Sequence, residues 1–356
     1  MYVPERCRER APLQRGSSGH AVRQYRANAG CALMEARVGV ASVRTDLVLG
    51  STHPLRLERP IVIASGPLGF GAEVSELIDL RDVGLFVTRG VSLAPRSGPS
   101  LPRVVEVPGG LLHAISRENP GVDEVIDRHA SAWRAAPCAV AISLVATNEK
   151  SLAALIARFE SRADQVRIDA YELDLTSPSD ALDGARWESA LDEAVRLIDA
   201  ASESTELPLI VKVSPDAASL RALAEAAADT GVTALSVSGS PIGYLPNRSR
   251  TRGALAEGVG ELSGPLIRPR ALAAVVSVHG ALPIIGGGGI GSPADALDAF
   301  AAGAAAVSLG SALWADPGLP RAVLESARRA AAARGLSSIS DLAGLALSGA
   351  DERARE

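Results

Sequence analysis

The chain has 356 residues, 47% of them hydrophobic and 22% charged, so it can bury a large core as one large domain or two ordinary ones. A net charge of -5 provides no basic surface, which argues against a nucleic-acid partner. The three cysteines match no disulfide framework, zinc site or iron–sulfur site, so we expect a reducing, cytoplasmic setting. No apolar run is long enough to cross a membrane, and we expect no membrane partner.

The two ends of the chain differ from the rest. Met1–Leu33 is rich in arginine and has no clear apolar period, which is also the composition of some transit peptides. We expect residues 1–45 to be a disordered extension, or upstream sequence ahead of a true start at Met34. Residues 349–356 are expected to form a C-terminal tail.

Short apolar runs alternate with amphipathic, alanine-rich stretches from Arg59 onward. The runs predict strands at Ile61–Ser65, Leu85–Arg89, Ala139–Val145, Ala170–Ser177, Leu209–Ser214, Ala234–Ser238, Pro283–Gly286 and Ala305–Leu309. The stretches predict helices at Ala72–Leu80, Asp123–Ala135, Glu149–Ser161, Arg186–Ala201, Ala217–Thr230, Arg268–Val278, Pro293–Ala302 and Gly318–Arg334. Strands this apolar are typical of a parallel sheet buried on both faces. The pattern predicts a (β/α)8 TIM barrel over residues 46–348, with an open doubly wound sheet as the alternative.

Local signals mark several helix ends. Ser292 precedes Pro293 as a predicted N-cap, and Ser214 precedes Pro215 in the same way ahead of the helix predicted from Ala217. Gly231 and Gly303 stand just past helix ends, where a left-handed residue is expected.

Two connections are long, at residues 91–122 and 239–267, and both follow the carboxyl ends of predicted strands. Active sites of TIM barrels lie at those ends, and long ordered loops there commonly serve as lids or substrate walls. We therefore expect both connections to be functional, with surface decoration as the alternative.

The most specific local signal is a buried strand that opens into a glycine run, Pro283–Ile290, ahead of a helix N-terminus at Gly291-Ser292-Pro293. Glycines let backbone N–H groups approach a phosphate closely, and the helix dipole favours an anion. The last predicted strand ends in Val307–Ala312, where the Ser311 hydroxyl can complete a cradle. Since TIM barrels often bind phosphate after strands seven and eight, the two elements together predict a phosphate site.

Three charged residues lie within or at the ends of apolar strands: Arg89, Asp174 and Lys212. A buried charge is costly unless an opposite charge or hydrogen-bonding groups stabilise it. These residues therefore predict either a structural ion pair across the barrel mouth or a ligand site, and the residues alone leave both interpretations open.

From about Leu47 to Leu347 the chain resembles the dihydroorotate dehydrogenases of the soluble class 1 type. The motifs that carry the resemblance are Pro60–Gly66, Gly69–Gly71, Leu93–Arg103, Asn119–Gly121, Val211–Val213, Leu262–Pro269, Gly286–Gly289, Leu309–Ser311 and Gly335–Leu342. The resemblance implies a barrel that binds FMN and oxidises dihydroorotate to orotate, passing hydride to flavin N5 while a base takes a proton. The FMN-binding positions that it implies are Ala64, Ser65, Arg89, Lys212, Gly264, Gly288, Gly289, Gly310 and Ser311.

The catalytic and substrate positions depart from the family pattern. By resemblance, Ser177 replaces the class 1 cysteine base and Arg89 replaces a lysine that contacts both flavin and substrate, so we expect both to be catalytic. The substrate positions, where family amides are mostly missing, are His113, Asp174, Ser179, Gly239 and Ser240; in addition, Ser116 replaces a glycine. Because orotate is an anionic ring with many donors and acceptors, these changes should alter which ligand fits.

Three hypotheses for the function follow. The altered residues favour an FMN-dependent oxidoreductase acting on another small dihydro or unsaturated substrate. The alternatives are a dihydroorotate dehydrogenase of pyrimidine biosynthesis and an FMN-retaining partner protein without turnover. The resemblance implies a homodimer, and the class 1B-like pattern at residues 64–71 implies an electron-transfer partner subunit.

Overall fold

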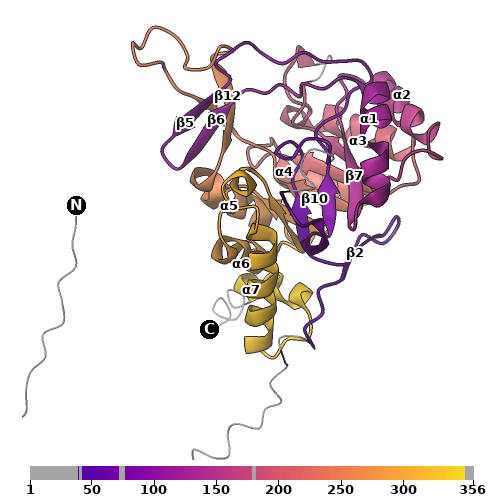
Figure 1. The fold of residues 1–356 in the computed structure, drawn as a ribbon, viewed down its shortest axis with the longest axis vertical. Helices are drawn as coiled ribbons and strands as arrows, with labels where there is room; N and C mark the ends of the chain where they lie inside the picture. Colours follow the sequence, from indigo (N-terminus) through magenta and orange to yellow (C-terminus); the bar gives the residue numbers. More distant parts are fainter. Residues whose placement is uncertain (1–38, 40–41, 72–76, 179–181, 349–356) are drawn as a thin grey trace, which may run out of the picture. The chain divides into compact units, whose positions relative to one another are not determined.

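Eight parallel strands form a closed barrel in the computed structural model, which describes residues 39, 42–71, 77–178 and 182–348 (Figure 1). Neighbours in the barrel are neighbours in the chain, and the pair Ile61–Val307 joins the first strand to the last. The strands are β3 (Ile61–Ile63), β4 (Leu85–Val87), β7 (Ala139–Leu144), β8 (Ala170–Asp174), β9 (Leu209–Val213), β10 (Ala234–Val237), β13 (Ile284–Gly287) and β14 (Ala306–Leu309). Closure confirms the predicted TIM barrel and excludes the open sheet, which has two free edges.

The α-helices of the described residues follow the barrel strands and pack against one another, as α6 and α7 do in gold in Figure 1. They are α1 (Val122–Ala135), α2 (Glu149–Glu160), α3 (Leu191–Ser202), α4 (Leu220–Asp229), α5 (Arg268–Val278), α6 (Pro293–Ala301) and α7 (Leu319–Ala333). Short 3₁₀ turns are η2 (Leu80–Asp82), η4 (Trp187–Ser189), η5 (Pro265–Ile267), η6 (Ser311–Trp314) and η7 (Ile339–Leu342). Buried alanines such as Ala201, Ala227 and Ala299 explain the alanine-rich composition, because small side chains let helices approach closely.

The predicted N-cap at Ser214 is wrong. α4 begins only at Leu220, after Ser219 in the left-handed conformation with φ of 51°. The Ser214 hydroxyl donates to the Glu188 carboxylate at 2.7 Å and accepts from the Asp216 backbone N–H at 3.2 Å, so it stabilises a turn ahead of the helix.

Two other helix starts also differ from the prediction. The helix predicted from Arg186 begins at Leu191, because the backbone N–H groups of Trp187 and Glu188 bond to the segment that follows β8. Most of the helix predicted at Ala72–Leu80 falls on residues 72–76, outside the described residues, and its end forms η2.

The remaining end signals are confirmed. Gly231 and Gly303 have φ of 79° and 114°. The Ser292 hydroxyl accepts from the backbone N–H of Asp295 and caps α6.

A short hairpin closes the amino-terminal end of the barrel. Strands β1 (Leu47–Leu49) and β2 (Leu55–Leu57) pair antiparallel, and alternate residues of each are buried. Their leucines pack on inward-facing residues near the starts of barrel strands, such as Leu85, Ala170 and Ala306. The hairpin was not predicted, because strands of three residues are too short to show a period.

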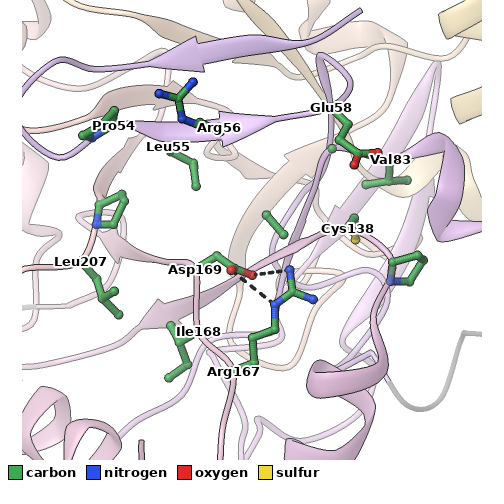
Figure 2. A pocket seen from close by; sticks show the side chains of 14 residues that line it. Pro54, Leu55, Arg56, Glu58, Val83, Cys138, Arg167, Ile168, Asp169 and Leu207 are labelled. Atoms are coloured by element: carbon green, nitrogen blue, oxygen red, sulfur yellow. Dashed lines mark hydrogen bonds and ion pairs between the residues drawn. The ribbon is translucent and has the colours of Figure 1, made fainter.

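A cavity of about 480 Å³ lies beside this hairpin (Figure 2). Its lining includes Arg56, Cys138, Arg167 and Asp169, and Arg167 pairs with Asp169 at 3.1 Å. Burial raises the pKa of the Cys138 thiol to about 11, so the thiol is protonated near neutral pH. None of the residues predicted to be functional lines this cavity, and this end of a TIM barrel usually serves stability.

The two long connections pair with each other in a second sheet. Strands β5 (Val104–Val107) and β6 (Gly110–His113) come from the first connection, and β11 (Ile242–Tyr244) and β12 (Val259–Ser263) come from the second. The sheet order is β11-β12-β6-β5, in which β6 and β12 join the two connections. Residues 91–122 and 239–267 are therefore one ordered structure that follows the carboxyl ends of two barrel strands.

Candidate active site at the barrel mouth

The interior of the barrel changes from apolar to polar toward the carboxyl ends of the strands. Residues two apart on a strand point the same way, so Ala170 is followed inward by Glu172 and then Asp174. Lys212 of β9 lies opposite Asp174 in register, and its Nζ is 3.9 Å from Glu172 Oε1. The Ser143 hydroxyl donates to the same Glu172 oxygen at 3.1 Å. The buried cation found in the sequence thus has a carboxylate partner inside the barrel.

Asp174, at the end of β8, is held by Arg117 from the loop between β6 and α1. Arg117 Nε donates to Asp174 Oδ2 at 3.1 Å, and its Nη2 donates to the Thr176 carbonyl at 2.9 Å and to the Thr176 hydroxyl. Asp174 also accepts from the Thr176 backbone N–H at 3.0 Å. The exposed fractions of the Arg117 and Asp174 side chains are 18% and 4%, so this ion pair is largely removed from water.

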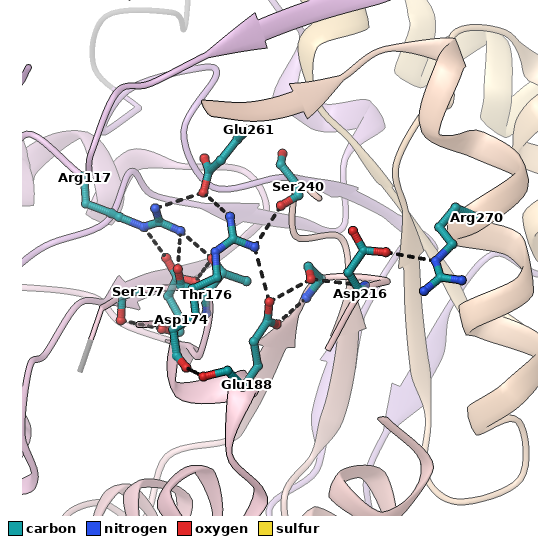
Figure 3. Close-up of polar contacts among 12 residues, drawn as sticks. Arg117, Asp174, Thr176, Ser177, Glu188, Asp216, Ser240, Glu261 and Arg270 are labelled. Carbon is teal, nitrogen blue, oxygen red and sulfur yellow. Dashed lines mark hydrogen bonds and ion pairs between the residues drawn. The ribbon is translucent and has the colours of Figure 1, made fainter. Parts of the chain in front are cut away.

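The same guanidinium links the barrel to the second sheet (Figure 3). Arg117 Nη1 donates to Glu261 Oε1 of β12 at 3.0 Å, and Arg186 Nη2 donates to the same oxygen at 2.7 Å. Arg186 also pairs with Glu188 at 3.2 Å. We call Arg117, Asp174, Arg186 and Glu261 the mouth cluster.

Charge pairing keeps both carboxylates of the mouth cluster ionised. Burial alone would raise the pKa of Asp174, but Arg117 and Lys212 outweigh it and hold this pKa well below the usual range. Burial would also raise the pKa of Glu261, which Arg117 and Arg186 lower instead. In return, the two carboxylates outweigh burial and raise the pKa of the Arg117 guanidinium.

Other groups at the mouth are shifted toward their uncharged forms. Burial raises the pKa of Glu172, although Lys212 opposes the shift, and burial also raises the pKa of Glu188. Burial lowers the pKa of His113, whose Nδ1 is 3.9 Å from Glu261 Oε2. His113 is therefore an uncharged imidazole near neutral pH.

The glycine run after β13 turns beside the start of α5. Gly288 and Gly289 have φ of 95° and 77°, in the region that favours glycine. A Cβ on Gly289 would lie 2.8 Å from the Arg268 backbone N, and one on Gly288 would lie 3.0 Å from the Ala271 side chain. Both glycines are thus required by close packing, independently of any ligand.

Open space lies along the neighbouring ends of β3 and β14. A Cβ on Gly66 would meet no atom within 4 Å, and one on Gly310 would meet nothing nearer than 4.0 Å. The Ala64 backbone N–H donates to the Leu309 carbonyl at 2.9 Å and holds the two strand ends together. The predicted cofactor residues along this edge are half-buried: Ala64, Ser65, Gly310 and Ser311.

The amino terminus of α6 already holds a carboxylate. Asp295 accepts from the Gly291 backbone N–H at 3.1 Å and from the Ser292 hydroxyl at 2.8 Å, and it forms an ion pair with Arg268. A phosphate at this terminus would compete with Asp295. The expected contribution of the α6 dipole therefore stays a prediction, in which a phosphate would share this terminus with Asp295.

Arg89 and Gly264 lie where the chain approaches the second sheet. Arg89 Nη2 is 3.8 Å from Glu118 Oε2, which also pairs with Arg103 at 2.8 Å. Gly264 has φ of 99°, and a Cβ there would lie 2.7 Å from the Gly110 Cα of β6. Gly264 is thus needed where β12 passes β6.

Ser177 is buried directly after β8. Its side-chain hydroxyl donates to the Asp174 carbonyl at 2.7 Å, and its own carbonyl accepts from the Trp187 backbone N–H at 3.2 Å. Among the described residues, no carboxylate or imidazole is hydrogen-bonded to the Ser177 hydroxyl. A proton-accepting role would thus depend on groups other than a neighbouring base.

Two of the remaining predicted substrate positions, Gly239 and Ser240, are in contact with Thr176 and Arg186. A Cβ on Gly239 would lie 2.7 Å from both Thr176 Cγ2 and the Val213 carbonyl oxygen, so no side chain fits at Gly239 on this backbone. The Ser240 carbonyl accepts from Arg186 Nη1 at 3.0 Å. Ser179 lies outside the described residues.

Five charged residues of this site were not singled out from the sequence: Arg117, Glu172, Arg186, Glu188 and Glu261. One carried a usable signal, because Glu172 stands two residues before Asp174 in a buried strand and must share its face. Arg117 and Glu261 lie 144 residues apart, and no spacing along the chain predicts their contact.

Two further findings concern metal binding and membrane spanning. Among the residues that the structure describes, no group of three or more His, Cys, Asp or Glu side chains could hold a metal ion. No described helix has both the length and the apolar character needed to span a membrane.

A closed parallel barrel with charged residues and a glycine-lined space at its carboxyl end defines a TIM-barrel protein with its candidate site in the usual place. The family profile described as dihydroorotate dehydrogenase matches residues 50–329. The chain therefore belongs to the dihydroorotate dehydrogenase family and is an oxidoreductase of the type that acts on CH–CH bonds.

Two curated relatives cover 82% of this chain and 95% of their own lengths. They are the dihydroorotate dehydrogenase B (NAD(+)) catalytic subunits of Trichlorobacter lovleyi and of Geobacter sp. strain M21, at 36% and 34% identity. The crystal structure of DHODH from Eimeria tenella in complex with ferulenol matches with a TM-score of 0.67 at 19% identity. That match covers 82% of this chain and 86% of the other, and it supports the fold.

Replacing Arg117 by methionine should lower the free energy of unfolding by about 3–5 kcal/mol near neutral pH, because two buried carboxylates lose a shared cation. Asp174 and Glu261 have lowered pKa values in the fold, so their stabilisation is present above their unfolded pKa values of about 4 and is lost as the pH falls through the lowered ones. The difference between the variant and the wild type should therefore shrink in acid.

Chemical denaturation across a pH series measures this difference. Arg81→Met is the matched control, because the pair of Arg81 with Asp79 is solvent-exposed and should contribute far less. Equal losses in the two variants, or a difference that does not change with pH, would contradict the assigned role of Arg117.

Proposed function

We propose that this protein is an FMN-dependent oxidoreductase that transfers hydride between flavin and a small dihydro or unsaturated substrate other than dihydroorotate. Family membership supports the flavin chemistry. The proposal of a different substrate is supported mainly by the mouth cluster, whose ion pairs occupy the substrate side of the barrel.

The residues present fit FMN. The space beside Gly66 and Gly310 is open where a Cβ would meet no close neighbour, and Ser311 follows at the same edge. Lys212 is a buried residue, 9% exposed, whose ammonium group lies inside the barrel mouth. These residues would hold the cofactor, with Ala64, Ser65, Arg89, Gly264, Gly288 and Gly289 as the other proposed contacts.

When bound, FMN supplies an acceptor or donor of hydride. The residues of the chain would orient the substrate, exclude water and move one proton. Ser177 is the proposed proton acceptor, and Arg89 is the proposed cation beside substrate and flavin. The proposed substrate contacts are His113, Asp174, Ser179, Gly239 and Ser240.

The substrate side is poorly matched to orotate. A site that recognises a ring by hydrogen bonds discriminates strongly, because unmatched buried polar groups are costly. Here Asp174 is bound to Arg117 and Thr176, and Gly239 can carry no amide side chain because Thr176 and the Val213 carbonyl oxygen lie too close.

Dihydroorotate is the second candidate substrate. It is favoured by the two relatives above, which are named dihydroorotate dehydrogenase B catalytic subunits that use NAD(+). In that case we would expect an electron-transfer partner subunit that passes electrons to NAD, and a homodimer of this chain.

Anaerobic reduction of the FMN-loaded protein tests the proposal. Dihydroorotate should leave the flavin absorbance unchanged, whereas photochemically reduced flavin should be reoxidised by an activated alkene such as an enone. Prompt bleaching by dihydroorotate would establish the second candidate. A bound flavin that no compound reduces or reoxidises would indicate a non-catalytic partner protein, and failure to bind FMN would overturn the proposal.

Replacing Lys212 by methionine should weaken FMN binding roughly 10–100-fold, because a buried ammonium group next to the cofactor would be lost. Titration of the apoprotein with FMN, followed by quenching of flavin fluorescence, measures the dissociation constant. Lys150→Met on the exposed side of α2 is the control and should bind FMN like the wild type. Unchanged affinity in the Lys212 variant would remove Lys212 from the cofactor site.

Replacing Ser177 by alanine should slow flavin reduction by the reacting dihydro compound about 10²–10⁴-fold while FMN binding is retained, because a positioned proton acceptor contributes on that scale. Stopped-flow absorbance under anaerobic conditions measures the rate. Ser189→Ala, at an exposed serine of η4, is the control. A wild-type rate in the Ser177 variant would assign the proton transfer to another group.

A further inference from the structure

The mouth cluster carries no net charge. Its two guanidinium groups, of Arg117 and Arg186, face two carboxylates whose pKa values lie below their usual range. Glu261 is shared by both arginines at 3.0 and 2.7 Å, so each cation is held by at least one ionised carboxylate. His113 beside Glu261 is uncharged near neutral pH because burial lowers its pKa.

The backbone conformation at Arg117 indicates that its partners hold it firmly. Ser116 and Arg117 are consecutive non-glycine residues with φ of 56° and 54°. Left-handed conformations are unfavourable for such residues and persist where the surrounding contacts impose them. The contacts here direct the guanidinium to Asp174, Thr176 and Glu261.

An anionic substrate would have to compete with carboxylates built into the protein. Asp174 is 3% exposed, ends a barrel strand and also holds the Thr176 backbone, so it cannot move away from Arg117 without disturbing β8. Glu261 lies within β12, which pairs with β6 at His113. Both carboxylates thus already occupy the Arg117 guanidinium, and a substrate carboxylate would have to displace one of them to pair with it.

We propose that the mouth cluster selects an uncharged ring compound over an anionic one as the substrate of this enzyme, which rests on the proposed FMN oxidoreductase function. The negative charge of the FMN phosphate would face Lys212 and Arg89, the proposed cations beside the cofactor, so those cations would be engaged by FMN. A neutral ring displaces none of the paired charges, and the buried Nδ1 of His113, which has no hydrogen-bond partner among the described residues, offers it a polar contact.

Ring pairs that differ only in a carboxylate test this selection. Uracil and orotate are one such pair, and benzamide with benzoate, in which an uncharged amide replaces the carboxylate, extends the set beyond pyrimidines. The dissociation constants follow from the change in the flavin spectrum on titration of the FMN-loaded wild type. The neutral member should bind at least about tenfold more tightly in each pair that binds, as expected for an unpaired charge beside fixed carboxylates.

Two variants of the mouth cluster, which remove charges of opposite sign, make the test more specific. Glu261→Gln removes one negative charge and should shift the neutral-to-anionic preference toward the anion by about tenfold or more. Arg186→Gln removes one positive charge and should shift the preference the other way, which keeps the test decisive if one variant loses FMN. Glu257→Gln, at an exposed glutamate shortly before β12, should leave the ratio unchanged.

The outcomes separate this inference from the proposed function. Tighter binding of the anionic members, an unchanged ratio in both cluster variants, or no binding of any neutral member to a yellow, FMN-loaded protein would overturn the charge selection. Failure of the proposed function is seen separately, as a chain without FMN or a flavin that no compound reduces or reoxidises. Thermal melting of each variant confirms that altered ratios come from folded protein.

Discussion

The candidate site depends on one constraint, which is that a carboxylate buried at a strand end must have a cation beside it. At the end of β8, Asp174 meets that requirement through Arg117 at 3.1 Å. Arg117 reaches it from the loop after β6, and the same guanidinium binds Glu261 of β12. One ion-paired arginine therefore joins the barrel to both long connections, and it positions the second sheet at the barrel mouth.

The mouth has two sides that differ in composition, one rich in small residues and the other in charged residues. Along β3, β13 and β14, glycines and small residues leave space or allow close packing, which suits a flat cofactor and its phosphate. Across from them, along β8, β9 and β12, charged side chains are paired with one another. A family can keep one fold while its site residues change, because function depends on the side chains at the site and not on the barrel that presents them.

The same glycine can serve packing and function, and the structure separates the two roles. A side chain on Gly289 would clash with Arg268 of α5, and a side chain on Gly264 would clash with Gly110 of β6. Gly66 and Gly310 face open space instead, and Gly66 is also required by its backbone φ of 111°. The glycine motifs seen in the sequence are therefore a mixture of structural and ligand-facing positions.

The sequence by itself determined the barrel, since local apolar runs and helix periods located all eight strands, and ordered motifs pointed to the family that the chain belongs to. It also showed that Lys212 and Asp174 are buried charges, because both lie in apolar strands. Only the tertiary structure decided their partners. Arg117, Arg186 and Glu261 lie in loops or in an unpredicted sheet, and contacts between residues 57 to 144 positions apart leave no periodic trace along the chain.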